Sequence, residues 1–201
     1  MRMMKLKRTL STLLALGLCT LLTPTRAAAE DPQVIVKSTT DQVLQAIEEG
    51  GQDRNHVYSV VEQMVLPHFD FRKMSTWVLG KNWRQGTPEQ QDRFVSEFQK
   101  LLVRTYSTAL IEYKGQEIRY LPTQSDGDGK IATVRTQVQQ GGGHLIPIDY
   151  RLYSAGSDWK VFDVAVDGVS LVANYRTTFN EEIRSKGFDG LVEDLAAKNA
   201  R

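Results

Sequence analysis

The clearest pattern in the chain is a strand that runs directly into a helix, over residues 159–179. Residues 159–166 alternate between two faces with the period of a β-strand. One face would carry Trp159, Val161, Asp163 and Ala165, and the other Lys160, Phe162, Val164 and Val166. Apolar residues on both faces imply that both sides of this strand are covered near its end.

The second half of this stretch predicts a turn and then a helix. Asp167-Gly168 is a turn signal, because glycine tolerates backbone angles that other residues avoid. Ser170 can cap a helix in which Leu171, Tyr175 and Phe179 recur every four residues on one face. The stretch therefore joins a sheet to the helix that packs on it.

Apolar residues at helical spacing predict four helices before the sheet. The first begins at Asp31-Pro32 and ends at Gly50-Gly51, and the second covers Arg54–Leu66. Asp70 caps a third, short helix that ends at Gly80. Thr87-Pro88-Glu89-Gln90 combines a cap, a proline at the first helical position and a capping-box glutamine, and the helix after it reaches about Tyr113.

Four strands follow, separated by glycine-rich breaks too short for a helical crossover, which predicts antiparallel hairpins. We expect them at Gln116–Leu121, Lys130–Gln139, Leu145–Tyr153 and Asp158–Val166. Closing helices are predicted over Leu171–Lys186 and Phe188–Lys198. The fold class is therefore α+β, a curved four-stranded antiparallel sheet with helices packed over its concave face.

The first 29 residues read as a cleaved signal peptide rather than as part of the fold. Four basic residues precede an apolar run of 13 residues, Leu10–Leu22, which is too short to span a membrane. Ala27-Ala28-Ala29 is a cleavage pattern, whereas Leu18 before Cys19 argues against lipid attachment. We expect residues 30–201 to form a single domain located outside the cytoplasm.

Cleavage changes the charge and the cysteine content. It removes the only cysteine and five of the 25 basic residues but none of the 24 acidic ones, which leaves 20 basic residues and a net charge of −4. That charge argues against nucleic acid as a partner and against binding to an anionic membrane by charge alone. Disulfide and thiol chemistry are excluded for the mature chain.

Residues that could carry catalysis are few. His56, His68 and His144 have no metal-ligand spacing, and no nucleophile, base and orienter set is recognisable. Asp149 and Asp163 lie inside strands, where pairing with Arg135 or Arg151 is the simpler interpretation. We therefore expect no catalytic residue, no metal and no cofactor.

The abundant feature is apolar surface on helices that face a curved sheet. This surface can be a packed core, as in a structural adaptor, or the lining of a cavity, and composition does not separate the two. An enzyme of the NTF2-like type is a further alternative, and it would need a polar pocket with Asp149 or Asp163 near a histidine.

Several motifs together, in their order and spacing, resemble one known family over nearly the whole mature chain. They are Leu66-Pro67, Val78-Leu79-Gly80, Thr87-Pro88-Glu89-Gln90-Gln91, then Leu101, Tyr106, Leu110, Tyr113 and Gly115 in the helix that follows, and finally Trp159-Lys160-Val161-Phe162-Asp163, Gly168-Val169-Ser170-Leu171 and Lys186-Gly187-Phe188-Asp189-Gly190-Leu191. With these motifs the chain resembles the MlaC family, also called the toluene-tolerance auxiliary family.

The resemblance implies a monomeric periplasmic phospholipid carrier with a fold that is NTF2-like in the broad sense. It implies that lipid moves between an outer-membrane lipoprotein–porin complex and an inner-membrane ABC transporter complex, with acyl chains in an apolar cavity between sheet and helices. Lipid-binding residues expected from the family motifs are Val78, Leu101, Tyr106, Leu110 and Val169. The predicted faces of the helices and strands add Phe98, Leu102, Val134, Ile148, Tyr150, Val164 and Tyr175.

Overall fold

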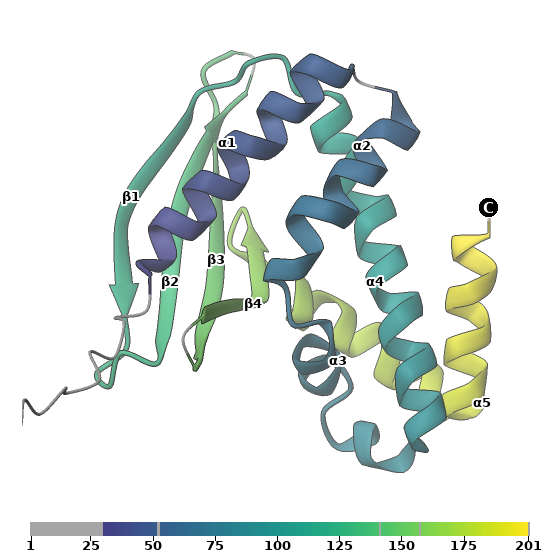
Figure 1. Cartoon of the computed structure of the whole chain (residues 1–201). Coiled ribbons are helices and arrows are strands. Elements are labelled where there is room, and N and C mark those ends of the chain that lie inside the picture. Colours follow the sequence, from purple (N-terminus) through teal and green to yellow (C-terminus); the bar gives the residue numbers. More distant parts are fainter. Residues whose placement is uncertain (1–29, 52, 141, 157, 201) are drawn as a thin grey trace, which may run out of the picture.

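The computed structural model describes residues 30–51, 53–140, 142–156 and 158–200 of the chain. The predicted signal peptide, residues 1–29, lies outside the described residues. Figure 1 shows a sheet on one side and a group of helices on the other, with α1 lying across the sheet. In the described part of the chain, no helix is long and apolar enough to cross a bilayer.

The first half of the described chain is helical, as predicted. α1 (Pro32–Gly50) begins at Asp31, whose carboxylate accepts a hydrogen bond from the Gln33 amide at 2.8 Å. α2 (Arg54–Val60) has an aspartate cap of the same kind. The prediction of one α-helix as far as Leu66 was wrong in its second half, because the chain continues as a π-helical segment η1 (Val61–Val65) and a 3-10 turn η2 (Leu66–His68). Pro67 lacks the amide hydrogen that would extend a regular helix through this point.

The third and fourth helices begin at the predicted caps. α3 (Phe71–Leu79) is capped by Asp70 and continues into a 3-10 turn, η3 (Gly80–Gln85). α4 (Pro88–Ile111) begins with the predicted capping box. The Thr87 hydroxyl accepts from the Gln90 amide at 3.3 Å, and the Gln90 side chain accepts from the Thr87 amide at 2.9 Å.

The sheet has five strands in sequence order rather than the predicted four, and every neighbouring pair is antiparallel. The strands are β1 (Ile118–Ser125), β2 (Ile131–Gln139), β3 (Leu145–Ala155), β4 (Asp158–Val166) and β5 (Val169–Ser170). The extra strand is two residues long, and it pairs back on β4 through the Asp167-Gly168 turn before the helix begins. Two residues are too short to produce an alternating pattern. The NTF2-like likeness stays a prediction.

A bulge in β4 changes which residues share a face. Val161 pairs with Leu152 and Asp163 pairs with Arg151, so Phe162 is an extra residue opposite one step of β3. The prediction that Val161 and Asp163 share a face was therefore wrong, because the extra residue shifts the alternation. A second bulge lies in β1 between Leu121 and Gln124, where the chain passes through Pro122.

The last element, α5 (Leu171–Asn199), is broken where two closing helices were predicted. Gly187 has φ 75° and ψ 179° inside it, a conformation that is essentially restricted to glycine. The Ser170 hydroxyl accepts from the Ala173 amide at 3.1 Å and caps the helix as expected.

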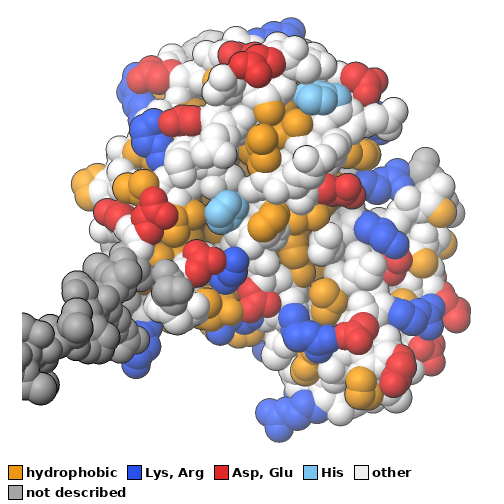
Figure 2. All heavy atoms as spheres, viewed as in Figure 1, with side chains coloured by type: hydrophobic (Ala, Val, Ile, Leu, Met, Phe, Trp, Pro, Cys, Tyr) orange, Lys and Arg blue, Asp and Glu red, His pale blue; other side chains and the backbone are white. Residues whose placement is uncertain are grey.

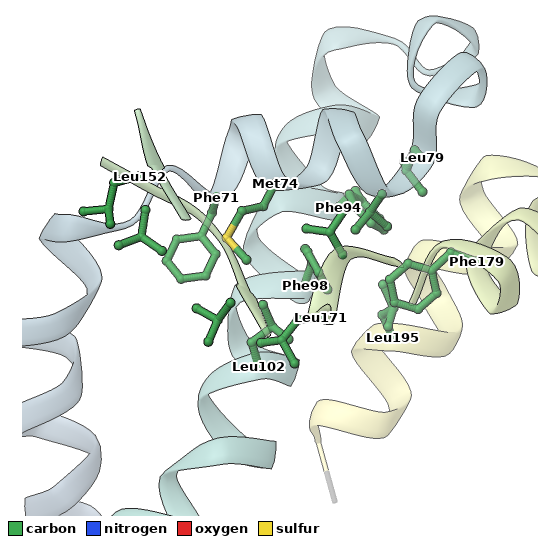
Figure 3. Packing of buried hydrophobic residues seen from close by; sticks show 14 of the residues in the cluster. Phe71, Met74, Leu79, Phe94, Phe98, Leu102, Leu152, Leu171, Phe179 and Leu195 are labelled. Carbon is green, nitrogen blue, oxygen red and sulfur yellow. The ribbon is translucent and has the colours of Figure 1, made fainter. Parts of the chain in front are cut away.

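The main core lies between the sheet, α3, α4 and α5, and Ile35 and Val36 of α1 also belong to it. Figure 3 shows Phe98 and Leu102 of α4 near Met74 and Phe71 of α3, and Phe179 near Leu195 in α5. A second cluster joins α1, α2 and η1 through Val43, Ile47, Val57, Val60 and Val61. Among the helices, α1 packs on β2, and α3 and α5 pack on β4. α4 packs mainly on α2, α3 and α5.

Candidate functional site

Rows of side chains run across the helix-covered face of the sheet, set by the strand register. Alternate residues on paired strands point to one side, so partners in register form continuous rows. The rows are Ala132–Leu152–Val161, then Val134–Tyr150–Val164, then Tyr120–Thr136–Ile148–Val166. Four of the predicted lipid-binding residues, Val134, Ile148, Tyr150 and Val164, are thus brought together.

Burial falls from one row to the next. All three residues of the first row are buried, with Ala132 1%, Leu152 0% and Val161 3% exposed. In the second row only Tyr150 is half-buried, and in the third Tyr120, Ile148 and Val166 all are. The apolar face therefore becomes accessible toward the end of the sheet where the β4–β5 turn lies.

α4 and the first turns of α5 contribute further apolar and aromatic side chains to the same core. Phe98 is fully buried, and its ring centroid lies 5.6 Å from that of Tyr175. Leu102 and Tyr106 follow Phe98 at four-residue spacing, which places the three on one helix face. Leu102 is buried, whereas Leu101, Tyr106 and Tyr175 are half-buried against the same core.

Two phenol groups in this lining have raised pKa values. Burial raises the pKa of the Tyr150 phenol to about 12, although part of this residue remains accessible. Burial, with Tyr175 beside it, raises the pKa of Tyr106 to about 12. The lining is therefore apolar with a few hydroxyl groups, the mixture typical of small-molecule sites.

Three of the predicted lipid-binding residues lie apart from these rows. Val78 is fully buried in the main core on α3. Leu110 packs against the second cluster, toward α1 and α2. Val169 is 56% exposed in β5, where it pairs with Val166 at the accessible end of the third row.

Sequence reasoning missed Tyr120 and Val166 as members of the lining. Both are half-buried against the main core, at the two ends of the third row. Alternation could have found Val166, which follows Val164 by two residues. It could also have found Tyr120, which follows Ile118 by two residues on β1 before the bulge.

A separate cleft of about 380 Å³ lies between α1, η1, η2 and the start of β4. Its walls combine Ile35, Met64 and Pro67 with polar residues that include Gln63, His68 and Asp158, and none of the predicted lipid-binding residues contributes. Figure 2 shows hydrophobic side chains in the middle of this face of the molecule, with charged side chains around and between them. The volume is at the small end of ligand pockets and suits a polar group rather than two acyl chains.

Asp163 has a structural role, and its predicted pairing with Arg151 is confirmed. It is 2% exposed, accepts hydrogen bonds from the Ser170 hydroxyl (2.7 Å) and the Val172 amide (3.2 Å), and lies 3.7 Å from Arg151. These contacts join β4 to the beginning of α5. Among the described residues, no three metal-binding side chains gather in one place.

Comparison with known proteins gives a consistent result. A family model described as "MlaC protein" matches residues 37–197. The toluene tolerance protein ttg2D of Pseudomonas putida is 32% identical over 167 residues, which cover 81% of this chain and 77% of that protein. The intermembrane phospholipid transport system binding protein MlaC of Haemophilus influenzae is 25% identical over 202 residues, covering 97% of this chain and 94% of that protein.

One solved structure is similar over almost its whole length. It is the phospholipid-binding protein from Ralstonia solanacearum in complex with a phospholipid. It is 33% identical, with a TM-score of 0.77, and the match covers 85% of this chain and 97% of that one.

Proposed function

The chain belongs to the MlaC family, and from that premise we propose that it is a phospholipid carrier rather than an enzyme. The observation that carries the proposal is the likeness, at 33% identity and TM-score 0.77, to a phospholipid-binding protein solved with a phospholipid. The rows of apolar side chains on the covered face of the sheet support it from this chain's own residues.

The acyl chains lie, in this proposal, between the third row of the sheet and the facing residues of α4 and α5. The residues that contact the tails are half-buried and mainly apolar, and they are Ile148, Val166, Tyr106 and Tyr175. The buried members Val78, Phe98, Leu102, Val134 and Val164 form the packed layer behind them. Val169, exposed beside Val166, lies at the mouth.

A carrier of this kind lowers the barrier to moving lipid through water. A pair of tails holds on the order of 30 methylenes, and exposing each costs about 0.8 kcal/mol. An apolar lining replaces the membrane interior for these groups, so the net free energy of transfer is close to zero. No bond is made or broken, and catalytic residues are not needed.

The remaining parts of the proposal concern location and partners. Residues 1–29 direct export and are then removed, which places the carrier in the periplasm. The carrier, a monomer, exchanges lipid with an inner-membrane ABC transporter complex and with an outer-membrane lipoprotein–porin complex. The direction of flow comes from these partners, one of which consumes ATP.

The test is to express residues 1–201, purify the exported protein, extract it with organic solvent and identify lipids by mass spectrometry. We expect phospholipid in a fixed molar ratio to protein. If the purified protein yields no phospholipid and takes up none from labelled vesicles, the proposal is wrong.

A pair of matched variants locates the lipid within the protein. Ile148→Glu places a carboxylate in the third row, whereas Thr133→Glu places one on the opposite face of the neighbouring strand. An unpaired charge against an acyl chain is costly, so Ile148→Glu should lose bound lipid and Thr133→Glu should keep it. Equal lipid content in two folded variants would place the tails elsewhere.

A further inference from the structure

Residues 71–86 form the most basic part of the mature chain. The segment FRKMSTWVLGKNWRQG holds Arg72, Lys73, Lys81 and Arg84, together with two of the three tryptophans. All 24 acidic residues of the chain lie outside it. The segment corresponds to α3 and η3, which Figure 1 shows at the opposite end of the molecule from the α1–α2 connection.

The fold gathers further cations around Trp77, which is 41% exposed. Lys73 lies four residues before Trp77 on the same face of α3, and Lys81 lies in η3, directly after the glycine that ends α3. The Arg151 guanidinium from β3 lies 5.9 Å from the Trp77 ring centroid. Arg176 of α5 lies against the end of α3, with Nη2 3.1 Å from the position that a Cβ atom on Gly80 would take. We call Lys73, Trp77, Lys81, Arg151 and Arg176 the basic–aromatic patch.

Aromatic rings on the outer face of the sheet hold this patch in position. The Phe162 ring, placed on that face by the bulge in β4, lies 4.9 Å from the Trp77 ring and 5.0 Å from the Arg151 guanidinium. The Lys73 ammonium lies 3.9 Å from the centroid of the Tyr153 ring. Cations over aromatic faces at these distances are attracted to them, so the rings hold the Lys73 and Arg151 side chains in place.

Most of the positive charge in the patch has no internal counter-charge. Of its four cations only Arg151 pairs with a carboxylate, Asp163, at 3.7 Å. Lys73, Lys81 and Arg176 form no ion pair with any residue in the described ranges. Fields are screened within about 10 Å at 0.1 M salt, so the patch acts by its own charge rather than by the net charge of the chain.

We propose that the basic–aromatic patch docks the carrier on an acidic surface of a partner protein, with Trp77 at the centre of the contact. Tryptophan, tyrosine and arginine are the residues that most often carry binding energy at protein interfaces. A lipid bilayer fits less well, because a helix lying in a membrane interface presents a row of apolar residues. Trp77 is the only large apolar side chain that α3 exposes. The choice of membrane-bound partners in the experiment rests on the proposed function.

The experiment compares binding to three surfaces. The probes are right-side-out spheroplasts and outer-membrane fragments from the bacterium that carries the gene, the same membranes after protease treatment, and protein-free vesicles made from their extracted lipids. We expect the labelled carrier to bind the untreated membranes, to bind less as NaCl rises from about 50 to 300 mM, and to bind neither protease-treated membranes nor vesicles.

Charge-reversal variants then assign the binding to the patch. Lys73→Glu with Arg176→Glu should weaken binding at least about tenfold, and Trp77→Ala should weaken it severalfold. Arg54→Glu with Lys114→Glu makes the same change in net charge at exposed sites away from the patch, and should leave binding unchanged. A photoreactive benzoylphenylalanine at position 76 should cross-link to a peptide rich in aspartate and glutamate.

Several results would overturn the inference. The inference is wrong if the carrier binds no membrane, or if binding survives protease treatment and also occurs on vesicles. It is also wrong if the cross-linked peptide is not acidic, or if the patch and control variants lose membrane binding equally. Thermal unfolding and lipid content are measured for each variant. A patch variant that keeps its lipid but no longer binds membranes supports this inference independently of the proposed function. A wild-type protein that carries no lipid contradicts the proposed function alone.

Discussion

Replacing the buried carboxylate of Asp163 should destabilise the fold by removing the link between β4 and α5. Asp163→Ala leaves the Val172 amide and the Ser170 hydroxyl without their acceptor and leaves Arg151 without its partner. Each buried donor left unpaired costs about 1–3 kcal/mol, and breaking a buried ion pair costs about 3–5 kcal/mol. Because the Arg151 side chain is 40% exposed, water recovers part of that loss, and we expect about 3 kcal/mol in all.

Urea denaturation followed by circular dichroism measures this change. Asp163→Asn keeps an acceptor oxygen and the side-chain volume but loses the charge, so it should cost about 1–2 kcal/mol. Asp149→Ala, on the same face of the neighbouring strand, serves as the control and should cost less than about 1 kcal/mol. If Asp163→Ala unfolds within about 1 kcal/mol of the wild type, the carboxylate does not hold β4 to α5 and its burial needs another explanation.

Three further predictions test the lining, the kink and a cap. Absorbance at 295 nm should show the Tyr106, Tyr150 and Tyr153 phenols ionising near pH 12, and Tyr150→Phe should remove one late step. The folded pKa values are raised above the unfolded value of about 10, so the stability that these groups contribute should be complete below pH ~10 and fall as the pH rises toward 12. Ionisation of all seven tyrosines near pH 10 would contradict this prediction. Gly187→Ala should lower the unfolding free energy by about 1–3 kcal/mol in urea melts, since φ 75° with ψ 179° strains any other residue, and an unchanged midpoint would show that α5 can straighten. Thr87→Ala should cost about 1 kcal/mol and Thr87→Ser much less, so equal losses would show that the capping hydroxyl contributes little.

Much of the fold was predictable because its signals are local. Asp31, Asp70, Thr87 and Ser170 cap the helices that they were expected to cap, since a side-chain oxygen must satisfy the first free amides. The strand pairing followed from short glycine-rich breaks, which leave room only for hairpins. The interruption at Gly187 was visible as a glycine between two helical stretches.

The features that were missed depend on contacts between distant segments. Phe162 extends the apolar run of β4, and only its contact with Trp77 of α3 shows that it faces away from the main core. Tyr120 joins the lining through its register with Thr136 on the neighbouring strand, a pairing that the residues of β1 do not specify by themselves. The structure places most of the twelve predicted lipid-binding residues around one core, but no pattern in the sequence separates the half-buried Ile148 and Tyr106 from the buried Phe98 and Val134.

The bulge at Pro122 has a consequence for self-association. β1 is an outer strand, and an unpaired outer strand offers amide and carbonyl groups to which a second molecule can add. Pro122 has no amide hydrogen, and the extra residue between Leu121 and Gln124 bends the strand, so a neighbouring copy cannot pair along its full length. At the other side, the backbone amide of Asp70 donates to the Val161 carbonyl at 2.9 Å, and β5 pairs with Ala165 and Val166, so both halves of β4 have a partner on this side. Both flanks of the sheet therefore resist the edge-to-edge addition of further copies of the chain.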